Sequence, residues 1–94
     1  MSPRVSEVCF VPADDELRAS GMQGWCTFVL DDQFKVEGIA VRKTTLGRLA
    51  LSFPFRQDSF GRRWRYLHPI TDQARRSVEN QVLALLDLNR EFTQ

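Results

Sequence analysis

The chain has 94 residues, of which 43% are hydrophobic and 27% charged, a composition that predicts one small globular domain and excludes a disordered tail. It contains no apolar run near the ~20 residues of a membrane span, and its first residues show no apolar signal core. Since both signals are missing, we expect a cytoplasmic protein with no membrane partner. The net charge is +1.

Alternating apolar residues predict an antiparallel sheet in the first two-thirds of the chain. The expected strands cover about 5–11, 24–30, 34–42, 48–53 and 62–67. Pro12 ends the first strand, and the acidic stretch 13–21 is expected to be a loop or a frayed half-turn. The second strand is apolar on both faces, so it is expected to be central or covered by a partner. Gly38 interrupts the alternation after the inward-facing Phe34 and Val36, which predicts a β-bulge.

One long helix is predicted at about 72–92, a stretch without Gly or Pro, with Thr71 as its N-cap. Its apolar residues follow a helical stripe that would seal the sheet or pack against a second copy. The stripe comprises Ala74, Val78, Val82, Leu85, Leu86 and Phe92. Because the helix is long for so small a sheet, and Leu83 and Leu88 lie off the stripe, we expect a homodimer. The predicted fold class is therefore a dimeric α+β domain.

Residues with catalytic or metal-binding chemistry are few. The two cysteines, Cys9 and Cys26, are interpreted as free thiols at small core positions, with an inter-strand disulfide as the lesser alternative. His68 is the only histidine and precedes a proline, which favours a hydrogen-bonded structural role over that of a general base. Asp31 and Asp32 are typical of a turn. We expect no enzyme, no metal, no cofactor and no small-molecule substrate.

The charge is uneven, and the basic part is the candidate site. Residues 38–76 hold nine Lys and Arg against two Asp and Glu, a net +7, whereas residues 1–37 hold three against seven, a net −4. The basic stretch between Phe53 and Ile70 contains Arg56, Arg62, Arg63 and Arg65. Guanidinium groups fork onto phosphate oxygens, and the rings of Trp64 and Tyr66 can stack on bases or bury in an interface. The plainer alternative is a two-stranded ribbon with a solvated, arginine-rich face.

The order of motifs resembles the SpoVG family of bacteria, also called stage V sporulation protein G or septation protein. The matching residues are Val5-Ser6-Glu7-Val8, Leu30 to Val36 as Leu-Asp-Asp-Gln-Phe-Lys-Val, Ile39 and Val41, Gly47, Pro54, Gly61, His68-Pro69-Ile70, and Arg75, Val78 and Val82. This resemblance implies a small, mostly antiparallel sheet with one C-terminal helix, a homodimer, no enzymatic activity, and a bacterial regulator that binds DNA and, in some members, RNA.

The resemblance also implies where nucleic acid would bind. The nucleic-acid-binding residues expected on this basis are Arg56, Arg62, Arg63 and Arg65, flanked by Arg75, Arg76 and Lys43. The chain departs from the family in having a single basic residue just after Pro54 and in its uncharged Cys9 and Val11. The rival hypothesis is a protein-interaction module whose arginines meet an acidic partner, without direct contact to nucleic acid.

Overall fold

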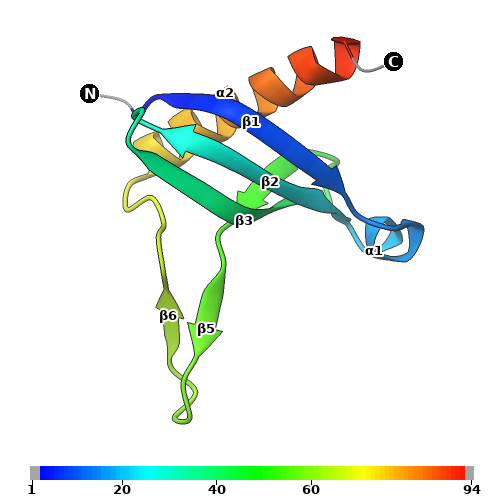
Figure 1. Cartoon of the computed structure of the whole chain (residues 1–94). Coiled ribbons are helices and arrows are strands. Elements are labelled where there is room, and N and C mark those ends of the chain that lie inside the picture. Colours follow the sequence, from blue (N-terminus) through cyan, green and yellow to red (C-terminus); the bar gives the residue numbers. More distant parts are fainter. Residues whose placement is uncertain (1–2, 93–94) are drawn as a thin grey trace.

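The computed structural model describes the backbone of residues 3–92 and the side chains of residues 3–86. The elements are β1 (Val5–Pro12), α1 (Asp15–Ala19), β2 (Met22–Leu30), β3 (Phe34–Lys43), β4 (Leu49–Ser52), β5 (Phe55–Gln57), β6 (Arg63–Arg65) and α2 (Asp72–Phe92). A four-stranded antiparallel sheet in the order β1-β2-β3-β4 packs against α2, and β5 and β6 form a separate two-stranded sheet (Figure 1). The predicted α+β class, with a mostly antiparallel sheet and a C-terminal helix, is confirmed.

Turn and cap residues explain how the sheet is connected. Asp31 and Asp32 both have a positive φ, +54° and +57°, which suits the tight turn between β2 and β3. The side chain of Asp14 accepts a hydrogen bond from the backbone N–H of Leu17 at 2.9 Å. This N-cap lets α1 form where the sequence predicted only a loop or a frayed half-turn.

Three bulges shape the sheet, and the sequence predicted one of them. In the pairing of β2 with β3, Cys26 lies opposite Ile39 and Phe28 lies opposite Val36. One residue of β2 is therefore matched by two residues of β3, and the extra residue lies at Gly38, as expected. A second bulge at Glu7, whose φ is +52°, was not predicted, because it lacks a glycine. A third bulge, also not predicted, lies between Met22 and Gly24 of β2, which pair with the adjacent residues Arg42 and Val41 of β3.

The core lies between the inner face of the sheet and α2. Its most deeply buried side chains are Phe28, Ile39, Val41, Val82 and Cys26. Burial raises the pKa of the Cys26 thiol to about 11, which keeps the thiol protonated and unreactive at neutral pH. The prediction of two core cysteines was wrong for Cys9, which is exposed and pairs with Thr27 on the opposite face of the sheet. Phe34 shares the face of β3 that carries the buried Val36, as expected, but at the start of the strand its side chain remains 63% exposed.

Two polar side chains of α2 bond the backbone of the edge strands. Gln81 accepts from the N–H of Val5 at 2.8 Å and donates to the carbonyl of Pro3 at 2.6 Å, at the start of β1. Glu79 accepts from the N–H of Leu51 in β4 at 3.0 Å. The helix therefore binds both edges of the sheet as well as its face, and Thr71 caps its first turn as predicted, through a 3.0 Å bond from the N–H of Ala74.

The hairpin of β5 and β6 extends away from the main sheet (Figure 1). The sequence predicted β6, as part of a longer strand at 62–67, but it predicted no strand at the position of β5, which begins directly after Pro54. Two strands alone are marginally stable in water, so local contacts must hold this hairpin in shape.

Candidate nucleic-acid interface

The strand register divides the arginines of the hairpin between its two faces. Phe55 lies opposite Arg65, and Gln57 lies opposite Arg63, so these four side chains share one face. Arg56 lies opposite Trp64 on the other face. We name these the Phe55 face and the Trp64 face. The guanidinium groups consequently point in two opposite directions from the ribbon.

Arginine and aromatic side chains are stacked on both faces. The guanidinium carbon of Arg63 lies 4.8 Å from the ring centroid of Phe55. The guanidinium carbon of Arg62 lies 5.5 Å from the ring of Trp64 and 5.8 Å from that of Phe60, which places Arg62 on the Trp64 face. Such contacts orient the side chains while leaving the outer edge of each guanidinium available to a ligand.

The carboxylate of Asp58 organises the turn of the hairpin. It accepts hydrogen bonds from the backbone N–H groups of Phe60 and Arg62, each at 2.9 Å. It also accepts from Nε of Arg62 at 3.2 Å and from Nε1 of Trp64 at 3.0 Å. The hydrogen bond from Trp64 is the main reason why the pKa of Asp58 lies below its ordinary value of 3.8, with further contributions from Arg62 and Phe60. One acidic side chain thus fixes both the turn and the orientation of Trp64.

The other predicted binding residues lie on other elements. Arg75 and Arg76 are in the first turns of α2, and Lys43 is the last residue of β3. Arg75 is paired with Glu79 at 3.2 Å and with Asp72 at 3.7 Å, and Arg62 is paired with Asp58. Among the described side chains, the remaining predicted cations form no ion pair with the protein itself. These are Lys43, Arg56, Arg63, Arg65 and Arg76.

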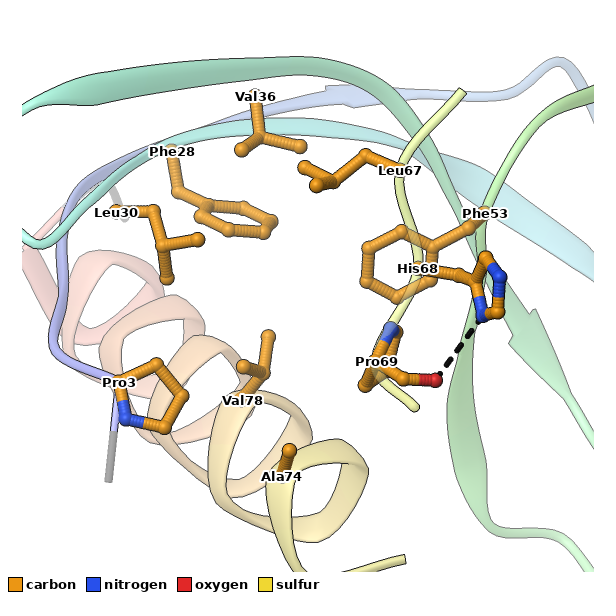
Figure 2. Close-up of a pocket in the computed structure, with 10 residues that line it drawn as sticks. All are labelled: Pro3, Phe28, Leu30, Val36, Phe53, Leu67, His68, Pro69, Ala74 and Val78. Atoms are coloured by element: carbon orange, nitrogen blue, oxygen red, sulfur yellow. Dashed lines mark hydrogen bonds between the residues drawn. The ribbon is translucent and has the colours of Figure 1, made fainter. Parts of the chain in front are cut away.

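A separate cavity of about 110 Å³ lies between the sheet, the start of α2 and the segment that leads from β6 to α2 (Figure 2). Its lining is mainly apolar and includes Phe28, Phe53 and Val78. Nδ1 of the exposed His68 lies 3.1 Å from the carbonyl oxygen of Pro69, so this ring bonds the backbone of the following residue. Within the described part of the chain there is no group of three or more His, Cys, Asp or Glu suited to a metal ion.

A family comparison relates this geometry to known proteins. The SpoVG family model matches residues 4–87, which is nearly the whole chain. The chain belongs to the SpoVG family. The match confirms the resemblance expected from the motifs, and membership suggests a regulatory protein related to sporulation or septation, in a family that is in general not enzymatic. A search of curated proteins gave no match. No described helix is both long and apolar enough to cross a membrane.

Sequence reasoning missed two residues of this SpoVG-family hairpin, Asp58 and Phe60. Asp58-Ser59-Phe60-Gly61 has Asp at the first position of a β-turn and Gly at the fourth, which is typical of a type I turn. The N–H of Gly61 donates to the carbonyl of Asp58 at 3.1 Å, as that turn requires. The residue types of this turn therefore predict its structure. The ring of Phe60 is 83% exposed at the tip of the hairpin.

We expect acid to release the Trp64 indole from Asp58. The folded pKa of Asp58 is depressed, so its stabilisation of the turn is present above pH 3.8 and is lost as the pH falls through the folded pKa. The Nε1–H signal of Trp64, followed by NMR, should shift with a midpoint below pH 3.8. In Asp58→Asn this transition should disappear. A midpoint at or above 3.8 would contradict the assigned role.

Proposed function

We propose that this SpoVG-family chain is a bacterial regulator that binds nucleic acid through the β5–β6 hairpin of a homodimer, with DNA as the first candidate and RNA as the second. The observation that carries the proposal is a projecting hairpin with four arginines, of which only Arg62 is paired with a carboxylate of the described chain. Residues 55–66 carry four Arg against one Asp, a local net charge of +3. Unpaired guanidinium groups on an exposed ribbon are suited to phosphate oxygens.

The homodimer part of the proposal is supported by apolar surface that the single chain leaves uncovered. On the face of the sheet opposite to α2, Val11 and Trp25 lie side by side in the register of β1 and β2, and both are exposed. The last turns of α2 extend past the sheet in Figure 1. Exposed apolar patches on small proteins mark interfaces. Light scattering at micromolar concentration should give twice the mass of 10.9 kDa, and a monomer mass would remove this part of the proposal.

The test of nucleic-acid binding is a titration of random duplex and single-stranded oligonucleotides over a range of salt concentrations. If three arginines of each subunit contact phosphates, a dimer neutralises about six, and log affinity for duplex should fall with log salt at a slope near −5. Fluorescence anisotropy measures the affinity directly. A flat salt dependence, or no binding at low salt, would contradict the proposal.

A protein-interaction module is the second candidate, because the segment that follows the hairpin carries exposed apolar side chains. Tyr66, Leu67 and Ile70 are all exposed between β6 and α2. Such a surface together with arginines also suits an acidic protein partner. A pull-down that recovers one acidic protein, with no nucleic acid retained after nuclease treatment, would favour this function.

A further inference from the structure

We propose that Phe60 is a wedge that enters a base step of duplex DNA from the minor groove and kinks the duplex; this inference rests on the proposed nucleic-acid function. Phe60 is at the tip of the hairpin and 83% exposed, although burial of its ring in the core would be favourable. Exposed phenylalanine at the end of a projecting cationic element is the arrangement by which minor-groove proteins unstack bases.

The two-faced distribution of arginines decides how the hairpin meets the duplex. Arg63 and Arg65 on the Phe55 face, and Arg56 and Arg62 on the Trp64 face, point in opposite directions. A flat row of phosphates could be contacted by only one of these pairs. Two rows of phosphates line a groove, one on each wall, so a ribbon that enters tip-first presents a pair of guanidinium groups to each wall.

In this orientation the tip reaches the floor of the groove, where Phe60 meets the base pairs. The strands of a ribbon are about 4.8 Å apart, and the minor groove of B-DNA is only about 6 Å wide. The ribbon with its side chains must therefore widen the groove. Opening a base step with an apolar wedge does this and bends the duplex towards the major groove. Pyrimidine–purine steps such as TA unstack most easily and are the expected insertion points.

The turn is built to hold such a wedge in place. Asp58 bonds the N–H of Phe60 itself, together with the N–H of Arg62 and the indole of Trp64. The N–H of Asp58 donates to the carbonyl of Arg62 at 2.9 Å, which closes the loop across the tip. A pre-organised tip loses little conformational freedom when it inserts between bases.

The experiment uses the whole protein and a duplex with one central TA step, with 2-aminopurine at that step and a donor and acceptor dye at the ends. Wild-type protein should increase both the 2-aminopurine fluorescence and the energy transfer between the ends. Phe60→Ala should abolish both signals, keep the salt slope and lower the affinity by less than about tenfold, whereas Phe60→Leu should preserve the kink. Netropsin, which occupies the minor groove, should displace the protein.

The matched control is Leu46→Ala, because Leu46 lies in the turn between β3 and β4 with a side chain that is 82% exposed. It should leave binding, unstacking and bending unchanged, and circular dichroism should show a native fold for every variant. Salt-dependent binding without unstacking or bending, or a kink that survives in Phe60→Ala, would overturn the wedge while leaving the proposed function intact. Binding undisturbed by netropsin would also overturn it. Absence of binding by wild-type protein would overturn both.

Discussion

Replacement of Arg56, Arg63 and Arg65 by Ala is expected to weaken duplex binding by roughly 100-fold or more at low salt. These are the three hairpin arginines that no described carboxylate pairs, so their charge is available to phosphate. A dimer loses about six contacts, and at about 0.5 kcal/mol each, the low end for one hydrogen bond, the loss is about 3 kcal/mol, or about two orders of magnitude in affinity. The salt slope should become about −2 or shallower, because at most one arginine in each hairpin remains. Anisotropy titrations at several salt concentrations measure both quantities.

A control with the same change of charge separates a local effect from a general one. Arg18, Arg42 and Arg48 all lie outside the hairpin, and their combined replacement by Ala also removes three positive charges. This control should retain most of the affinity and a slope near −5. Equal losses in the two triple variants would show that net charge, and not the hairpin, governs binding. Arg62 is left in place because it also bonds Asp58.

Truncation of Phe28 is expected to have the largest effect on folding. Its ring is 1% exposed, it lies in the central strand β2, and it lines the cavity beside α2 (Figure 2). Phe28→Ala should lower the free energy of unfolding by about 3–5 kcal/mol, because it removes a buried ring and enlarges an existing cavity that the core cannot fully close. A domain of this size then loses more than about 10 °C in Tm. Urea unfolding at fixed protein concentration measures the change.

Phe34→Ala is the matched control for this prediction. Phe34 is the first residue of β3, and its side chain is 63% exposed, so most of its ring already contacts water. Its truncation should change the free energy of unfolding by less than about 0.5 kcal/mol. A similar loss of stability in both variants would contradict the assignment of Phe28 to the core and of Phe34 to the surface.

The sequence predicted secondary structure correctly where the residue types at a position allow few backbone conformations. The helix at 72–92 was predicted with its bounds and its N-cap, because an uninterrupted apolar stripe after Thr71 has few alternatives. The bulge at Gly38 was predicted because glycine breaks a period of two. The bulge at Glu7 has no such marker, so alternation alone could not place it.

The candidate site was predicted less completely than the fold. Composition pointed to the arginines of the hairpin, but only the pairing of β5 with β6 shows that they are divided between two faces. A residue's partner across a hairpin depends on the turn, and the Asp58 turn was not recognised. The pairing places Arg56 with Trp64, on the face opposite to Arg63 and Arg65, so both faces of the hairpin are cationic. Arg75, which was expected to flank the site, forms ion pairs with Asp72 and Glu79.

The bonds from α2 to the margins of the sheet have a consequence for self-association. An unpaired strand margin invites another chain to add to it, and repeated addition has no natural end point. The amide of Gln81 occupies the outward N–H of Val5, and the carboxylate of Glu79 occupies that of Leu51, one on each margin. Strand-by-strand growth is therefore blocked at both of these positions, which directs assembly towards closed contacts made by side chains.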